Sequence, residues 1–394
     1  MTIQIDGVGT VNKGAELLLF AILQEVEKHY PDAKVIYNDG TFMESNQQSE
    51  YFHSELRIVK PYYMTPFFTF LLKRFHIIGI IERLNPHWNV KYLLDYFLHY
   101  KVDVIFNASG YSISDNFIGS EVKVNRMEKF FLNKKRGKTI IVYLPQAFGP
   151  CEKNATKACV KILSKHADLV FARETISYNY LRKENFDLTK LYQYPDFTCL
   201  VDGIFPQQYA TLINSVCLIP NMKMVDKHII DYKEYLNFWG IAVKTIQHEG
   251  RNVFVLNHEG FGDEIICKEI SQKYSIPLVS GLNALETKGV ISNAYLVISS
   301  RFHGVASSLN SAVPCLATSW SHKYELLFKD YHQKGCILNV LNIDDCKNKI
   351  ICMLQKGINQ TTRNVLSVEA KKKKKQSREM WNIIWNKIDN YERH

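Results

Sequence analysis

The stretch TIQIDGVGTVNKGAELLLFAILQEV, residues 2–26, decides the fold class of this chain. It begins with a short apolar run at 2–5, passes through two glycines and continues into a helical pattern. Asn12 stands where a helix N-cap is expected. The apolar positions that follow recur at i, i+3 and i+4 and therefore share one helix face: Ala15, Leu18, Leu19, Ile22 and Val26. The stretch predicts a strand, a glycine turn and an amphipathic helix, which together form the repeating unit of an α/β sheet.

The same alternation continues along the chain. Further apolar runs of strand length lie at 34–37, 102–107, 139–144, 169–172, 216–220, 252–257, 277–279, 295–299 and 315–318. Many of them are apolar throughout, as strands buried on both faces of a parallel sheet should be. Gly and Pro interrupt the pattern at 202–208. We therefore predict a doubly wound α/β protein with two halves, 1–205 and 206–367, each with its own sheet.

A long helical pattern follows from about residue 368 to 394. Its largest apolar side chains share one face: Trp381, Ile384, Trp385 and Ile388. Two exposed tryptophans on one stripe would be an unusual surface for an isolated tail. We therefore expect this helix to dock, and the first domain is the predicted docking partner.

The composition indicates a folded globular chain. Hydrophobic residues make up 46% and charged residues 22% of 394 residues, which excludes a disordered protein, and the length fits two to three domains. Lys and Arg exceed Asp and Glu by 49 − 39 = 10, so an anionic partner is permitted. Five of these charges form the run 371–375. The excess therefore does not choose among nucleic acid, a phosphorylated small molecule and an anionic membrane surface.

The nine cysteines predict neither a disulfide framework nor a zinc site. No CxxC occurs, and the pairs Cys151/Cys159 and Cys346/Cys352 have spacings that do not suit structural zinc. Most cysteines lie in apolar surroundings, as Cys217 does, which predicts buried reduced thiols in a reducing compartment. The first residues also lack the pattern of a secretory signal. We therefore expect a cytoplasmic protein.

One apolar stretch, MTPFFTFLLKRFHIIGII at 64–81, raises the question of a membrane. Lys73, Arg74 and His76 fall at its centre, and each central charge costs roughly 2.5–3.5 kcal/mol of insertion, so a spanning helix is disfavoured. Two alternatives stay open. One is a buried helix of the first domain, and the other is an interfacial helix that gives peripheral contact with the inner face of the membrane.

The segment GVGTVNKGAE at 7–16 is the first candidate binding site, because it follows the first strand and opens the first helix. Glycines let a backbone approach a ligand, and a helix start offers free N–H groups. Asn12, Lys13 and Gly14 are the candidate ligand contacts. The segment is neither GxGxxG nor a Walker loop, so it predicts no dinucleotide or ATP site. A plain glycine turn is the alternative.

The segment SSRFHG at 299–304 is the second candidate, again at a strand end and a helix start. A guanidinium from Arg301, an imidazole from His303 and a helix N-terminus converge there, which suits a phosphate or a carboxylate. Histidine is also the side chain best able to transfer a proton near neutral pH. The alternative is an Arg-x-His with a purely structural role.

Two further polar groups follow apolar strands. Arg173, just after 169–172, would serve as a second anion clamp or as an ordinary helix-start arginine paired with a carboxylate. His258 and Glu259, after 252–257, would form an acid/base pair or simply a polar strand end. The sequence contains no Ser/His/Asp order and no His-rich metal spacing, so no metal is expected.

Taken together, these motifs resemble the polysaccharide pyruvyl transferase family. The matching stretches run in order through nearly the whole chain: NKGAELLL (12–19), NASGYSISD (107–115), LPQAFGP (144–150), FARETISYNYL (171–181), YPDFT (194–198), IPNMKM (219–224), LNHEG (256–260), KGVIS (288–292) and SRFHGVASSLNSAVPCLATSWSHKYELL (300–327). The last is long and specific. Residues 51–98 match the family poorly.

The resemblance implies a GT-B-like fold, with two Rossmann-like domains facing a cleft, and a helix crossing back at the C-terminus. It implies transfer of a pyruvyl group from phosphoenolpyruvate to a sugar hydroxyl pair of a polysaccharide or lipid-linked glycan, without a cofactor. In that family the arginine and histidine of the SRFHG-type motif bind the donor and serve catalysis. The roles fall here on Arg301, the Phe302 main chain, His303 and the adjoining Gly304, with Arg173 as an additional donor contact.

The chemistry suits these residues, because phosphoenolpyruvate carries two anionic groups and its reaction needs a general acid. The halves 1–205 and 206–367 are expected to serve the acceptor and the donor. A nucleotide-sugar glycosyltransferase is the runner-up, since it would share the fold. A nucleic-acid-binding protein is a third hypothesis, disfavoured because no RNP, zinc-finger or helix-turn-helix signature occurs.

Overall fold

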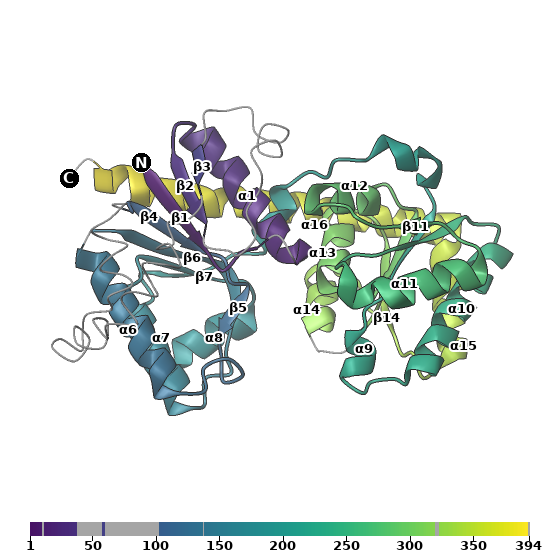
Figure 1. The fold of residues 1–394 in the computed structure, drawn as a ribbon, viewed down its shortest axis with the longest axis horizontal. Coiled ribbons are helices and arrows are strands. Elements are labelled where there is room, and N and C mark those ends of the chain that lie inside the picture. Colours follow the sequence, from purple (N-terminus) through teal and green to yellow (C-terminus); the bar gives the residue numbers. More distant parts are fainter. Residues whose placement is uncertain (10–11, 38–56, 60–101, 137, 320–322, 393–394) are drawn as a thin grey trace, which may run out of the picture. The chain divides into compact units, whose positions relative to one another are not determined.

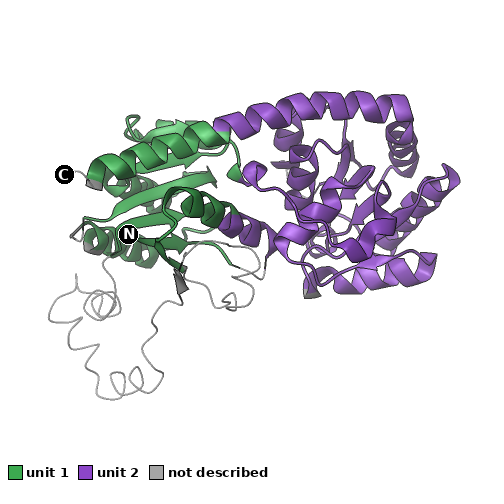
Figure 2. Cartoon of the chain, turned by 90° about the horizontal axis from the view of Figure 1, so that it is seen from above, with its two compact units in different colours: residues 1–10, 21–197, 377–394 green, residues 11–20, 198–376 purple. Residues whose placement is uncertain are grey.

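The computed structural model describes residues 1–9, 12–37, 57–59, 102–136, 138–319 and 323–392. The chain forms two compact units (Figure 1, Figure 2). Unit 1 comprises residues 1–10, 21–197 and 377–394, and unit 2 comprises 11–20 and 198–376. The segment 64–81, with its predicted buried or interfacial helix, lies outside the described residues.

Unit 1 is built on a parallel sheet in the order β3-β2-β1-β4-β6-β7-β8, with β5 pairing β6. Its strands are β1 (Thr2–Asp6), β2 (Lys34–Tyr37), β3 (Arg57–Val59), β4 (Val104–Asn107), β5 (Tyr111–Ile113), β6 (Ile140–Phe148), β7 (Leu169–Ala172) and β8 (Leu191–Gln193). The order reverses between β1 and β4, as in a Rossmann-type sheet, where ligands bind beyond the carboxyl ends of the strands.

Helices follow the strands of unit 1 in alternation (Figure 1). They are α1 (Lys13–His29), whose first turns belong to unit 2, then α6 (Glu121–Arg136), α7 (Asn154–His166) and α8 (Thr175–Lys183); the 3-10 helix η1 (Phe197–Leu200) begins at the last residue of this part of unit 1 and continues into unit 2. Strand β7 is buried at every position because its residues are all apolar. The predicted doubly wound architecture is confirmed for this unit.

Unit 2 repeats the architecture with the parallel order β11-β10-β9-β12-β13-β14. Its strands are β9 (Val216–Ile219), β10 (Val253–Leu256), β11 (Leu278–Val279), β12 (Leu296–Ser299), β13 (Cys315–Thr318) and β14 (Ile337–Leu338). Its helices are η2 (Gln207–Leu212), α9 (Lys223–Asp226), α10 (Tyr232–His248), α11 (Phe261–Tyr274), α12 (Ala284–Ser292), α13 (Phe302–Asn310), α14 (Lys323–Asp330) and α15 (Ile343–Leu354). The central strands β9, β10 and β12 are fully buried.

The C-terminal helix α16 (Lys356–Glu392) ends in unit 1, which confirms the predicted docking. The rings of Trp381 and Trp385 stack at 5.1 Å, and Trp381 meets Phe106 edge-on at 5.7 Å. The helix begins at Lys356, earlier than the 368 expected from the pattern. Its first turns are polar and are anchored by tertiary bonds instead, such as Asn359 Nδ2 donating to the Tyr295 carbonyl at 3.1 Å.

Four short strands escaped the sequence pattern: β3, β5, β8 and β14. Each is only two or three residues long, so an apolar run cannot be distinguished there from a loop. All nine cysteines are free, and all but Cys352 are buried, as their apolar surroundings predicted. Within the described ranges, none of the helices combines the length and the apolar character that a bilayer crossing requires.

Candidate active site

The candidate site of unit 2 lies where three neighbouring parallel strands, β10, β9 and β12, end. Arg301 follows β12 and occupies the N-cap position of α13. His258 and Glu259 follow β10, and Asp263 lies in the first turn of α11. Because carboxyl ends of parallel strands share one edge, residues far apart in the sequence come together here.

Arg301 is held by two carboxylates. Its Nε donates to Asp263 Oδ2 at 2.7 Å, its Nη2 lies 2.5 Å from the same oxygen, and its Nη1 pairs with Glu259 Oε2. Only 13% of the Arg301 side chain is exposed, and the Asp263 side chain is fully buried. Glu259, with 18% exposed, is the more accessible of the two acids.

Burial acts in opposite directions on the two partners of the buried pair. It lowers the pKa of Arg301 to about 10 and raises the pKa of Asp263 to about 6. Both groups therefore stay charged at neutral pH. The one guanidinium is shared between two carboxyl groups, so an incoming anion needs Arg301 to exchange its bond with Glu259.

Asn12 connects the start of α1 to this cluster. Its Oδ1 accepts hydrogen bonds from the backbone N–H groups of Gly14 at 2.9 Å and Ala15 at 3.1 Å, which confirms the predicted N-cap. Its Nδ2 donates to Glu259 Oε1 at 2.7 Å. Glu259 thus joins the first turn of α1 to Arg301, one carboxylate oxygen for each.

His303 packs on the same turn of α1. A Cβ added at Gly14 would lie only 2.1 Å from His303 Nδ1, so the ring rests on bare backbone. The Phe302 ring meets the imidazole edge-on at 5.5 Å. Gly304 allows a similarly close approach, because its added Cβ would lie 2.6 Å from Ser299 Oγ.

Lys13 lies beside this turn with its Nζ 2.8 Å from Glu16 Oε2. Glu16 is buried and also accepts from the Ala284 backbone N–H at 3.1 Å, which fixes the start of α1 against α12. Asn12, Lys13 and Gly14, the candidate ligand contacts of the first predicted half, belong to unit 2 in the structure and lie beside the Arg301 motif. Their contact with a ligand stays a prediction.

His258 is buried, and its Nδ1 has no hydrogen-bond partner among the residues that the structure describes. Burial, together with electrostatic interactions with Arg301, His303 and Lys13, lowers its pKa to about 3, so the ring is neutral at physiological pH. The hydrogen bonds seen for Glu259 go to Asn12 and Arg301. An acid/base pair between His258 and Glu259 therefore has no support in these bonds.

A buried hydroxyl network behind Arg301 was missed by sequence reasoning. It centres on Ser300, whose Oγ lies 2.6 Å from both a tyrosine and a threonine hydroxyl and whose carbonyl accepts at 3.0 and 2.8 Å from an asparagine and a second tyrosine. The partners are Tyr235, Thr318, Asn221 and Tyr324. They fix the backbone from which Arg301 projects. The only local signal was a polar Ser at the end of an apolar run.

Asp263 was also missed. It carries a buried negative charge, yet in the sequence it looks like an ordinary acidic residue in a first helical turn. Besides Arg301, it accepts from the Met222 backbone N–H at 2.9 Å, which ties the end of β9 to the cluster. The signal that could have indicated it is the run of glycines around it, Gly260 and Gly262, which lets the chain turn sharply after His258-Glu259.

Arg173 lies in unit 1, just after β7. Its Nη1 is 3.6 Å from Asp196 Oδ2 and its Nε is 3.4 Å from Glu174 Oε2, with 18% of the side chain exposed. The expected pairing with a carboxylate is therefore present. Its predicted role as a donor contact alongside Arg301 stays a prediction.

No group of three or more His, Cys, Asp or Glu side chains that could hold a metal ion occurs within the described ranges. Among curated proteins, none matches the sequence of this chain. The fold, however, is shared with solved structures. HepE of Anabaena in complex with UDP is 13% identical with a TM-score of 0.53, covering 97% of this chain and 99% of its own.

Two UDP-N-acetylglucosamine 2-epimerases show the same likeness. The enzyme of Neisseria meningitidis, bound to UDP-GlcNAc, is 11% identical with a TM-score of 0.59 and covers 98% of this chain and 100% of its own. That of Methanocaldococcus jannaschii is 12% identical with a TM-score of 0.55, covering 93% and 99%. At such identities the likeness shows the fold alone, which is GT-B-like as predicted.

The family is shown by the sequence itself. The family model for polysaccharide pyruvyl transferase matches residues 12–322, which is more than half of the chain and includes the Asn12 turn, Arg173, the His258-Glu259 pair and Arg301 to Gly304. The predicted resemblance is confirmed. This chain is a transferase and belongs to the polysaccharide pyruvyl transferase family.

Proposed function

We propose that this protein transfers a pyruvyl group from phosphoenolpyruvate to two hydroxyls of one sugar, leaving a cyclic pyruvate ketal. The observation that carries the proposal is the placement of Arg301 and His303 at the N-terminus of α13, with His303 packed on Gly14. A cation, a proton donor and the positive end of a helix dipole then face one point.

The donor has chemistry that fits this point. Phosphoenolpyruvate carries a phosphate and a carboxylate, and charge-assisted bonds from an arginine favour such groups. Arg301 has its guanidinium shared between Asp263 and Glu259. Because Asp263 is buried and Glu259 is partly exposed, we expect an anionic donor to take the place of Glu259 while Asp263 keeps the guanidinium oriented. Lys13 and, in unit 1, Arg173 are the further cationic residues of the proposal.

Ketal formation divides into two steps. In the first, a proton adds to the methylene carbon of the donor, and a sugar hydroxyl attacks C2 and loses its own proton. In the second, the C2–O bond to phosphate breaks, a second hydroxyl of the same sugar bonds to C2, and the proton of that hydroxyl passes to the departing phosphate. His303 is the proposed general acid for the first step, and Arg301 with the helix N-terminus stabilises the departing phosphate. The proposal requires no cofactor.

The proposed acceptor is a sugar of a polysaccharide or of a lipid-linked precursor in cell-envelope synthesis, and the proposed location is the cytoplasm or the inner face of the membrane. The membrane contact predicted for 64–81 stays a prediction. It is tested by flotation with vesicles that contain anionic lipid, because an interfacial segment should bring the full-length protein to the vesicle fraction. Protein that stays unbound at low salt contradicts it.

The function is tested by incubating the protein with phosphoenolpyruvate and a glycan panel while phosphate release is followed. We expect glycan-dependent release, and a mass increase of the product glycan by one ketal-linked pyruvate. His303→Gln should lower kcat by about 10²–10⁴-fold with donor affinity nearly unchanged. Arg301→Ala should instead weaken donor binding about 10- to 100-fold, which corresponds to a lost charged hydrogen bond of roughly 1.5–3 kcal/mol.

Arg378→Ala is the matched control, since Arg378 is exposed on α16 in unit 1. It should behave as the wild type. Absence of phosphoenolpyruvate binding together with tight binding of UDP would contradict the proposal and favour the nucleotide-sugar glycosyltransferase alternative. If His303→Gln melts at a lower temperature but retains full activity per folded molecule, His303 is structural and the general-acid role is wrong.

A further inference from the structure

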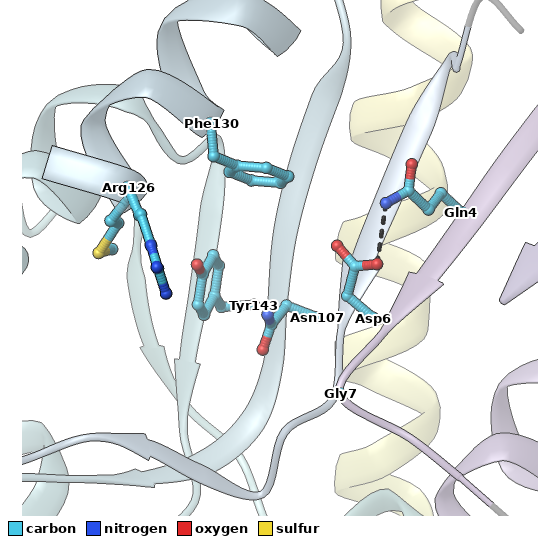
Figure 3. A pocket seen from close by; sticks show the side chains of 8 residues that line it. Gln4, Asp6, Gly7, Asn107, Arg126, Phe130 and Tyr143 are labelled. Carbon is cyan, nitrogen blue, oxygen red and sulfur yellow. Dashed lines mark hydrogen bonds between the residues drawn. The ribbon is translucent and has the colours of Figure 1, made fainter. Parts of the chain in front are cut away.

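Unit 1 contains a pocket whose residues have no role in the proposed donor site. It has a volume of about 350 Å³ and lies on one face of the sheet, between strands β1, β4 and β6 and helix α6. Figure 3 shows Arg126 and Phe130 extending from α6 toward Tyr143, with Asn107 and Asp6 on the strands beside it. Gln4 and Asp6 are two residues apart in β1 and therefore share this face.

Only one of the two carboxylate oxygens of Asp6 accepts a hydrogen bond from a residue that the structure describes. Its Oδ1 accepts from Gln4 Nε2 at 2.8 Å, whereas nothing in the described part of the chain donates to Oδ2. Gln4 is itself held in place, because its Oε1 accepts from Lys134 Nζ at 3.2 Å. Burial raises the pKa of Asp6, as expected for a carboxyl with a single hydrogen-bond donor.

The neighbouring polar groups also have donors or acceptors that make no hydrogen bond within the described part of the chain. Tyr143 is only 6% exposed, and its hydroxyl makes no hydrogen bond to a described residue. Asn107 Oδ1 accepts from Ser109 Oγ at 3.0 Å and from Gln146 Nε2 at 3.3 Å, which leaves its Nδ2 as a donor toward the pocket. The Arg126 guanidinium has no carboxylate partner within the described ranges. Asp6 and Asn107 are half-buried and Arg126 is exposed, so these groups offer hydrogen bonds to a polar molecule that enters the pocket from solvent.

The chemistry of the lining selects among occupants. The unpaired Asp6 oxygen accepts hydrogen bonds and repels anions, which disfavours a phosphate or a second donor molecule. Asn107 Nδ2 and Arg126 donate, and Tyr143 can do either. The Phe130 ring offers an apolar wall beside these groups. A neutral ring that bears several hydroxyls on its edge and C–H groups on its face matches all of these features.

We propose that this pocket binds one sugar ring of the acceptor, with the free oxygen of Asp6 accepting hydrogen bonds from sugar hydroxyls. This inference rests on the proposed function, which supplies the need for a glycan. A volume near 350 Å³ is at the small end of ligand sites, so the pocket admits one ring and leaves the rest of the glycan outside. In this proposal, Tyr143 and Asn107 form hydrogen bonds with further hydroxyls on the edge of the ring. Arg126 donates from helix α6 on the opposite wall of the pocket.

The test measures sugar binding directly, without phosphoenolpyruvate. Methyl glycosides of hexoses and of N-acetylhexosamines serve as probes, and saturation-transfer NMR with the full-length protein measures their binding. At least one probe is expected to bind. Asp6→Asn and Tyr143→Phe should each weaken its binding about tenfold or more, because each removes a buried polar contact.

Asp32→Asn and Tyr192→Phe are the matched controls, since these residues lie in the turn after α1 and in β8, outside the pocket. They should leave binding unchanged, and thermal melting should show that all four variants are folded. If no methyl glycoside binds the wild type, or if the pocket variants bind as it does, water alone fills the pocket and the inference is wrong.

The two proposals can fail separately. Suppose that phosphoenolpyruvate reacts with a glycan but Asp6→Asn and Tyr143→Phe leave the acceptor KM unchanged. The pocket inference then fails, while the pyruvyl transfer stands. Suppose instead that phosphoenolpyruvate does not bind, but the pocket variants lose sugar binding. The proposed donor then fails, while the pocket remains a sugar site.

Discussion

Gly14 carries the imidazole of His303 directly on its backbone. A Cβ at Gly14 would lie 2.1 Å from Nδ1 and 2.2 Å from Cε1 of that ring, well inside van der Waals contact. Gly14 and His303 are far apart in the sequence, yet both stand at a helix start, one in α1 and the other in α13. The absence of a side chain at Gly14 therefore sets the position of the proposed general acid.

Gly14→Ala should displace the His303 ring. We expect kcat to fall by about 10²-fold or more, because a shift of the order of 1 Å in a catalytic group has this effect. Gly357→Ala is the control, since a Cβ there meets nothing within 4 Å, and it should leave kcat unchanged. Full activity of Gly14→Ala would show that the ring moves aside without consequence.

Glu259→Gln should strengthen donor binding. The change removes one of the two negative charges on Arg301, and the single carbonyl oxygen of glutamine can accept from only one of the two donors, Asn12 Nδ2 and Arg301 Nη1. We expect the phosphoenolpyruvate Kd to fall about tenfold at low salt, since a like charge near the donor is lost. Isothermal titration calorimetry measures it. The control is Glu264→Gln, whose carboxylate pairs with Lys268 in α11. Weaker donor binding in Glu259→Gln would contradict the proposal that the donor anion replaces Glu259 at the Arg301 guanidinium.

The buried His258 ring should lower the free energy of unfolding in acid. Its pKa in the folded protein is about 3, below the ordinary 6.5, so the native state keeps the ring neutral while the unfolded chain takes up a proton. The free energy of unfolding therefore falls as the pH drops below 6.5, by about 2 kcal/mol between pH 6.5 and 5 from this group.

His258→Gln should remove this part of the pH dependence. Urea unfolding at several pH values measures it for the wild type and the variant. His248→Gln is the control, because the His248 side chain is 87% exposed, and it should retain the wild-type slope. Equal slopes in the wild type and His258→Gln would mean that the buried ring is protonated in the native state.

Trp381→Ala should destabilise unit 1. The Trp381 side chain is buried against the rings of Phe106, Phe197 and Trp385 at 5.7, 5.8 and 5.1 Å. Truncation of such a side chain costs about 3–5 kcal/mol. Tyr391→Ala, on the same helix with 43% of the residue exposed, should change the free energy of unfolding by less than about 0.5 kcal/mol. Equal melting temperatures of the wild type and Trp381→Ala would contradict docking of this helix.

Much of the fold could be predicted because its signals are local. The continuous apolar runs at β7, β9, β10 and β12 are buried on both faces, and a run of that kind has few other uses. Asn12 was recognisable as a cap because a capping side chain bonds to N–H groups two and three residues ahead. The short strands β8 and β14 could not be predicted, since their pairing depends on a neighbouring strand rather than on their own residues.

By itself, the sequence determined the α/β class and the family, because strand and helix periods and the ordered motifs are written in consecutive residues. Only the tertiary structure decided the electrostatic state of Arg301 and His258. The carboxylates on Arg301 come from 38 and 42 residues away, and Asn12 reaches Glu259 across 247 residues. Charge interactions act through space and depend on burial, so no local pattern can reveal which acid faces which base.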